Sequence, residues 1–207
     1  MTNKKVMIMT DSSCDMPQEF IDQNNIEIVP FNIIIDGHTY LDRRDITTIE
    51  LFEKVDRLKE LPKTAAIAPS IFMDKFNEYV NDYDIVYIGL GTGFSSASSS
   101  AMVAAKEFDN VYVIDSCNLS AGVGLLLNKA CIFRNEGYSA KEIAEKIKNI
   151  VPRVRVQFVI NTLKYLHMGG RCSGTIRLLG TALQIKPIIR VVDNKMVIGK
   201  KPIGYTR

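Results

Sequence analysis

Short apolar runs alternate with segments of helical spacing through the first 150 residues. The runs are rich in Val and Ile and predict strands at 6–9, 26–35, 85–90 and 111–114. Apolar residues that recur every three or four positions predict helices at 48–60, 70–80, 95–108 and 120–135. The run at 85–90 is apolar throughout, as in a parallel strand covered on both faces. We therefore expect an α/β domain with a mostly parallel sheet and helices on both faces.

The pattern changes after a predicted helix at 139–150, where Ser139 and Glu142 have the spacing of a capping box. Pro152 ends that helix, so we place the domain boundary between residues 1–152 and 153–207. The second part predicts a strand at 155–161, helical segments at 162–168 and 175–183, and a hairpin turning at Asp193-Asn194. We expect a smaller α+β domain that is truncated at its C-terminus, since nothing covers the hairpin edge.

Composition places the chain among ordinary globular proteins, with 46% hydrophobic and 24% charged residues. No apolar run is long enough to span a membrane, and the apolar stretch near the N-terminus is too short for a signal peptide. The four cysteines are scattered without a C-x-x-C motif, and the chain has only two histidines. We expect a reduced, cytoplasmic protein without a metal site.

Charge is divided unevenly between the two parts. Residues 1–150 hold 15 Lys/Arg against 22 Asp/Glu, a net charge of −7, whereas residues 151–207 hold 11 against one, a net charge of +10. A basic segment raises nucleic acid as a partner. The basic residues are spread out and lack interleaved aromatics, so we expect no nucleic-acid binding and favour contact with the acidic part of the same chain or with a further acidic segment.

The segment 168–187 combines an anion-binding side chain with apolar surface. Arg171 follows two glycines and offers five donors in a planar fork suited to a carboxylate or phosphate. An apolar run follows over 178–185. This combination indicates a ligand with a charged head and an apolar body. The alternative is that Arg171 pairs with a structural carboxylate.

A second candidate is the glycine- and serine-rich stretch 85–101, which leads from the buried strand into a helix. The amides of a helix start bind anions, and Ser95 and Ser96 add hydroxyl donors. A dinucleotide fingerprint needs G-x-G-x-x-G, and Ser96 replaces its third glycine. Asp115, about twenty residues further on, keeps a nucleotide site open as an alternative. The serines could also simply cap the helix.

The segment 10–15 closes the first strand, yet it gives no clear nucleophile. Cys14 would need a partnered base, and neither His38 nor His167 has a suggestive neighbourhood. We expect Asp15 to cap the following helix. Taken alone, Thr64 reads as a turn or cap residue in a loop. Paired carboxylates for acid–base catalysis are not visible, so we assign no catalytic residue.

These pieces occur in an order that resembles the DegV family of bacterial fatty-acid-binding proteins. The matching motifs are T-D-S-S-C-D-M-P at 10–17, the segment 28–46, V-I-D-S with Ser120, Gly122 and Gly124 at 113–124, and G-G-R continuing to I-K-P at 169–187. The match is carried by several motifs in register and covers essentially the whole chain. It is therefore much more specific than any one of them.

The resemblance implies a two-domain carrier that holds a long-chain fatty acid between its domains, with the tail in an apolar tunnel. Thr64 matches the family's carboxylate-binding threonine, although Ala65–Ala68 replace the S-Q-P-S that follows it. Ser95 matches the family's second carboxylate-binding hydroxyl when the alignment is made back from Ser100-Ala101, and it is our first choice. Counting forward from Thr64 without a gap selects Ser96, which is our second choice. Arg171 matches the arginine near the head group. Family members are longer and have a C-terminal histidine that has no counterpart here.

The resemblance further implies that the carrier presents its acid to a fatty-acid kinase, which forms the acyl phosphate for phospholipid synthesis. The carrier itself would need no catalytic residue, cofactor or metal, and it would contact the membrane peripherally to exchange lipid. The alternative function is an enzyme or binding protein for a phosphorylated small molecule or nucleotide, which would use the glycine- and serine-rich stretch.

Overall fold

The structure is a computed structural model that describes residues 4–160, Leu166, 170–171 and 187–199. The chain divides into two compact units, Met1–Pro152 and Arg153–Arg207.

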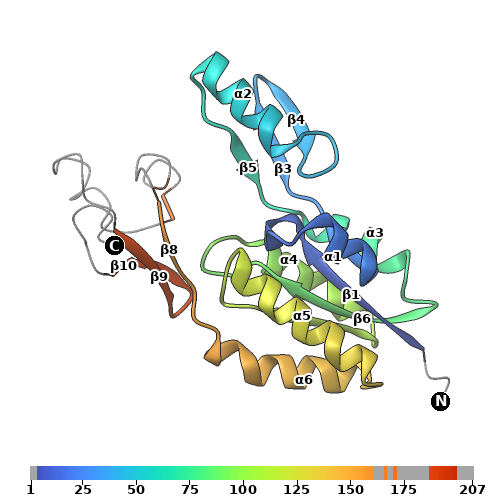
Figure 1. The fold of residues 1–207 in the computed structure, drawn as a ribbon. Coiled ribbons are helices and arrows are strands. Elements are labelled where there is room, and N and C mark those ends of the chain that lie inside the picture. The colour runs from blue at the N-terminus through green and yellow to red at the C-terminus, as the bar shows by residue number, and fades with distance from the viewer. Residues whose placement is uncertain (1–3, 161–165, 167–169, 172–186, 200–207) are drawn as a thin grey trace. The chain divides into compact units, whose positions relative to one another are not determined.

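A four-stranded, fully parallel sheet forms the centre of the first unit (Figure 1). Its strand order is β2 (Ile26–Val29), β1 (Lys5–Asp11), β6 (Tyr83–Gly89), β7 (Val111–Asp115). Residues 85–88 are completely buried, as expected for a strand covered on both faces. The predicted parallel α/β architecture is confirmed.

Helices cover both faces of this sheet (Figure 1). On one face, α3 (Pro69–Asn77) and α4 (Ala97–Ala104) pack in a core that includes Met9, Phe72 and Tyr87. On the other, α5 (Ala121–Asn135) and α6 (Ala140–Ile150) contact β1, β6 and β7. The predicted capping box starts α6, because Ser139 Oγ accepts from the Glu142 amide while Glu142 accepts from the Ser139 amide. The short helix α1 (Gln18–Gln23) precedes β2.

The predicted single strand at 26–35 is wrong, since the chain leaves the parallel sheet after Val29. Pro30 has no N–H to donate to a strand ladder. The amide of Phe31 donates to Ser12 Oγ at 3.1 Å. These two residues end β2, and the next strand belongs to a different sheet.

The residues that follow build a small lobe, residues 32–65, which we call the β3–β5 lobe. It contains β3 (Asn32–Ile35), β4 (His38–Leu41), α2 (Thr48–Leu58) and β5 (Lys63–Ala65), with the antiparallel strand order β4-β3-β5. Asp36 and Gly37 join β3 to β4 with φ values of 57° and 69°. Two successive positive φ values are typical of a type I′ hairpin turn.

The second unit contains an antiparallel sheet of order β10-β9-β8. Its strands are β8 (Gln157–Val159), β9 (Ile188–Val192) and β10 (Lys195–Ile198). The predicted hairpin is confirmed, and Asp193 and Asn194 both have positive φ. Apart from Leu166, the predicted helical segments at 162–168 and 175–183 lie outside the described residues.

Candidate functional site

Three of the segments that the sequence singled out, 10–15, 85–101 and 113–124, meet at the carboxyl edge of the parallel sheet, where ligands of open α/β sheets bind. Three of the four connections that leave the strands there are the β1 turn (residues 11–14), the serine loop (residues 90–96) after β6, and the β7 loop (residues 116–120); the fourth leads from β2 into the β3–β5 lobe. The amide of Gly91 donates to the carbonyl of Asn118 at 2.8 Å, so the serine loop and the β7 loop are joined.

Ser95 lies at the end of the serine loop, just before α4. Its side chain is half-buried, and its Oγ accepts from the amide of Ala97 at 3.2 Å. A hydroxyl that accepts one hydrogen bond keeps its own proton to donate. Ser96 is the exposed N-cap residue of α4 and makes no side-chain cap bond. Ser95 is therefore the better fixed of the two candidate hydroxyls.

Thr64 lies in β5 and not in the loop that the sequence predicted. It pairs with Ile33 of β3, and its side chain is exposed. The prediction was wrong because the strand partner, 31 positions earlier in the chain, supplies the order that the local sequence lacks. The structure thus fixes the backbone that carries Thr64 through the sheet of the β3–β5 lobe.

Arg171 belongs to the second unit, follows Gly170 (φ 69°) and is exposed. Thr64, Ser95 and Arg171 therefore lie on three separate segments. Their assembly around one ligand stays a prediction.

A buried carboxylate, which the sequence did not single out, organises the carboxyl edge. Asp11 is completely buried. One of its oxygens accepts from the amide and hydroxyl of Ser13. The other accepts from Tyr87 Oη at 3.1 Å and from the amide of Leu90 at 2.7 Å. Asp11 thereby satisfies donors from β6, the β1 turn and the serine loop.

Burial dominates the electrostatics of this cluster. Loss of solvent raises the pKa of the Asp11 carboxyl, although its hydrogen bonds to Leu90, Ser13 and Tyr87 oppose the shift. Burial and the neighbouring carboxylate raise the pKa of Tyr87 well above its ordinary value. Tyr87 therefore remains a neutral donor towards Asp11.

The expectation that Asp15 caps a helix is wrong. Asp11 caps the short 3-10 turn of residues 12–14, whereas Asp15 has φ 49° and ends that turn. Helix α1 begins later, after Pro17, and has no side-chain cap. Asp11, the last residue of β1, is completely buried, whereas Asp15 is exposed.

The β7 loop is tightly hydrogen-bonded and partly strained. Asp115 accepts from the amide and hydroxyl of Thr92 at 3.2 and 2.5 Å and from the amide of Cys117 at 2.8 Å. Cys117 and Ser120 have φ values of 50° and 51°, which are uncommon outside glycine. Oδ1 of Asn118 is buried without a hydrogen-bond partner among the described residues. The carboxylate on which the nucleotide alternative depended thus holds the serine loop.

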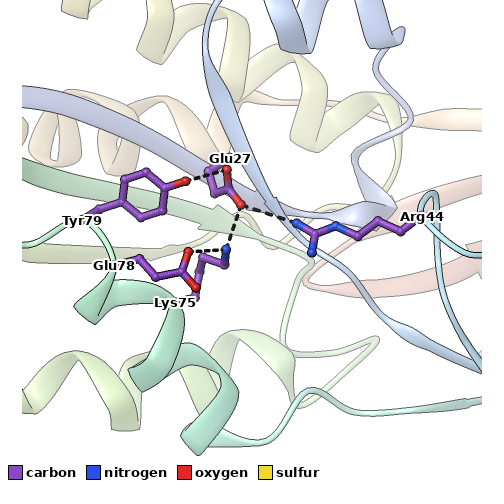
Figure 2. A network of polar contacts seen from close by, with 5 residues as sticks. All are labelled: Glu27, Arg44, Lys75, Glu78 and Tyr79. Atoms are coloured by element: carbon purple, nitrogen blue, oxygen red, sulfur yellow. Dashed lines mark hydrogen bonds and ion pairs between the residues drawn. The ribbon is translucent and has the colours of Figure 1, made fainter.

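A second polar network joins the β3–β5 lobe to the edge of the parallel sheet. Figure 2 shows Glu27 of β2 at its centre, with Lys75 at 3.1 Å, Arg44 at 3.6 Å and the hydroxyl of Tyr79 at 3.0 Å. Lys75 also pairs with Glu78 at 2.6 Å. Arg44 lies between β4 and α2, so this network holds the loop at the base of the lobe.

The described residues offer neither a metal site nor a membrane-spanning helix. They include no group of three His, Cys, Asp or Glu side chains that could hold a metal ion. Within the same ranges, no helix is long and apolar enough to cross a membrane.

Comparisons with known proteins give a consistent result over almost the whole chain. The family model described as "uncharacterised protein, DegV family" matches residues 5–206. A DegV domain-containing protein of Clostridium acetobutylicum is 36% identical over 204 residues, which cover 97% of this chain and 73% of the relative.

Two solved structures extend the comparison to the fold. A DegV family protein from Thermus thermophilus, described for its fatty acid binding, has a TM-score of 0.87 and 28% identity and covers 97% of this chain and 72% of its own. A stearic acid-binding protein from Eubacterium ventriosum has a TM-score of 0.84 and 28% identity, covering 96% and 71%. The chain belongs to the DegV family.

Proposed function

We propose that this chain binds a long-chain fatty acid, with the carboxylate held by the hydroxyls of Thr64 and Ser95 and by Arg171. Ser96 is the second candidate for the serine position. The observation that carries this proposal is the close likeness in fold to solved DegV proteins that bind fatty acids. The position of Ser95, fixed by its bond to Ala97 with its proton free to donate, supports it further.

The head group and the tail of the fatty acid would contribute separately to the binding free energy. A carboxylate removed from water needs charge-assisted hydrogen bonds, each of which contributes about 1.5–3 kcal/mol. Each buried methylene of the tail adds about 0.8 kcal/mol. The tail therefore supplies most of the affinity, and the hydroxyls and the guanidinium fix the orientation of the head. The apolar tunnel for the tail is part of this proposal.

The same proposal makes the chain a carrier and not an enzyme. It would present its bound acid to a fatty-acid kinase, and the kinase would form the acyl phosphate. The net charge of +10 on residues 151–207 suits contact with an acidic or phosphate-bearing partner. Loading and unloading would take place in the cytoplasm during peripheral contact with the membrane.

Native mass spectrometry of the purified protein, followed by titration of the delipidated protein with oleate, tests the binding proposal. Thr64→Val and Ser95→Ala each remove one hydroxyl and should weaken oleate binding by at least about tenfold, because one charge-assisted bond contributes about 1.5–3 kcal/mol. Thr39→Val is the matched control for the first, because Thr39 is also an exposed threonine on a strand of the β3–β5 lobe. Ser99→Ala, an exposed serine of α4, is the control for the second.

Delipidated protein that takes up no oleate would refute the proposal. Equal losses in the control variants would refute the assignment of Thr64 and Ser95. A thermal shift with a nucleotide or a sugar phosphate, and none with a fatty acid, would favour the alternative function instead.

A further inference from the structure

We propose that Asp11 is a positioning residue for the head group, because it holds in register the two segments that carry Thr64 and Ser95. This inference rests on the proposed function and names a residue that would never touch the ligand. It follows from two chains of hydrogen bonds that both start at the β1 turn.

The first chain of contacts leads from Asp11 to Ser95. Asp11 accepts from the amide of Leu90, the first residue of the serine loop, at 2.7 Å. The carbonyl of Leu90 accepts from Ser98 Oγ of α4 at 2.6 Å. Leu90 therefore joins the start of the loop to the helix at its far end. Ser95 lies between these two points, so its hydroxyl is placed by the contact between Asp11 and Leu90.

The second chain of contacts leads from the β1 turn to Thr64. Ser12, the next residue after Asp11, accepts from the amide of Phe31 at 3.1 Å. Phe31 directly precedes β3, and its carbonyl accepts from the amide of Asp42 after β4 at 2.9 Å. Within the lobe, β3 pairs with β5 so that Ile33 lies opposite Thr64. The β1 turn, whose geometry Asp11 fixes by capping it, therefore also fixes the entrance to the lobe.

Four donors point at the Asp11 carboxylate, and only a group with acceptors on both oxygens can satisfy them. An asparagine would present an NH₂ group to one pair of donors and leave that pair unmatched. The cluster has no spare room either, because a Cβ on Gly89 would lie 2.5 Å from Ser98 Oγ and 2.7 Å from Tyr87 Oη. A buried carboxylate is costly to the fold, so its presence here calls for a role other than stability alone.

The test compares two ligands that share a tail and differ in the head: oleate and methyl oleate. Asp11→Asn should weaken oleate binding about tenfold, equivalent to about 1.4 kcal/mol, and leave methyl oleate binding within twofold. In Asp11→Asn the hydroxyls of Thr64 and Ser95 are displaced, so they lose their contacts to the carboxylate of oleate. The site for the tail, which both ligands share, is unaffected. A merely structural role for Asp11 would weaken the binding of both ligands alike.

A control for stability and a second variant complete the design. Ser139→Ala removes the cap of α6, so it lowers stability without touching the carboxyl edge and should change neither affinity. If Asp11→Asn does not fold, Ser12→Ala takes its place, since it removes only the acceptor for Phe31. In the Thr64→Val background, Asp11→Asn should cost clearly less than in the wild type, because the part of its effect that passes through Thr64 is already lost and only the part through Ser95 remains.

The outcomes separate this inference from the proposed function. A wild type that binds oleate no better than methyl oleate refutes head-group recognition itself. A wild type that prefers oleate, with the preference lost in Thr64→Val but kept in a folded Asp11→Asn variant, overturns the role of Asp11. A preference kept in Ser12→Ala overturns the chain of contacts from the β1 turn to Thr64. Additive losses in the double variant would overturn it as well.

Discussion

Tyr87→Phe measures how strongly the buried carboxylate cluster holds the first unit together. Tyr87 is completely buried, its hydroxyl donates to Asp11 at 3.1 Å, and its ring packs edge-on against Phe72 with 5.2 Å between centroids. Phenylalanine keeps the ring and removes only the donor. Asp11 retains its other donors, which come from Leu90 and Ser13, but loses one hydrogen bond at a completely buried position.

A hydrogen bond to a charged group contributes about 1.5–3 kcal/mol. We expect the free energy of unfolding to fall by about 2 kcal/mol, which lowers the melting temperature by about 4–8 °C for a chain of this size. Urea unfolding followed by circular dichroism gives the change from the shift of the midpoint at constant slope.

Tyr79→Phe is the matched control, because it removes a tyrosine donor to a carboxylate at nearly the same distance. Tyr79 donates to Glu27 at 3.0 Å, but Glu27 is partly exposed and also pairs with Lys75 and Arg44. Water and the two cations replace the lost bond, so we expect a loss below about 1 kcal/mol. Equal losses in the two variants would refute the reasoning that burial makes the Asp11 cluster strong.

Three further predictions concern stability and are all measured by urea unfolding. Gly89→Ala should lower the free energy of unfolding by about 1–3 kcal/mol, because its Cβ would lie 2.5 Å from Ser98 Oγ and from the Tyr87 ring; an unchanged midpoint would contradict this. Ser139→Ala should cost about 1 kcal/mol through loss of the capping box with Glu142, and Ser139→Asp should restore most of it. Burial raises the pKa of the Asp11 carboxyl in the folded state above 3.8, its ordinary value. Between these two pKa values the folded state still holds the proton and the unfolded state has lost it, so the free energy of unfolding of the wild type falls as the pH rises through this range. The stability of the wild type relative to Asp11→Asn should therefore be greater at pH 4.5 than at pH 7.5, and the opposite trend would show that the hydrogen bonds outweigh desolvation.

Local signals in the sequence predicted the elements that local physics determines. The apolar run at 85–90 indicated a parallel strand, Ser139 with Glu142 indicated a helix start, and Asp193-Asn194 indicated a hairpin; the structure contains all three. In each case the information lies within a few residues of the element itself.

The predictions from the sequence were wrong where a contact between residues far apart in the chain determines the structure. The apolar run at 26–35 continues through Pro30, and the break into two sheets depends on the contact between Phe31 and Ser12. Thr64 becomes part of a strand only because β3 is there to pair with it. Among the site residues, the sequence placed Ser95 at a helix start but could not rank it against Ser96 by its hydrogen bonds.

Asp11 was missed for the same reason. Its partners Tyr87 and Leu90 lie 76 and 79 positions away in the chain. The available signal was its place two residues after the apolar run at 6–9, where the carboxyl end of a central strand leaves little room for solvent. Asp15 has no such position, and this difference could have separated the two aspartates.

Cys14, the last residue of the β1 turn, carries a thiol that is wholly inaccessible in the folded chain. Burial also raises its pKa, so even a reagent that reached it would meet little thiolate. Alkylation of this sulfur by iodoacetamide can proceed only after the turn opens. The rate at which Cys14 is labelled, measured by peptide mass mapping, therefore reports how often the β1 turn unfolds locally. The measurement can be made with and without added fatty acid.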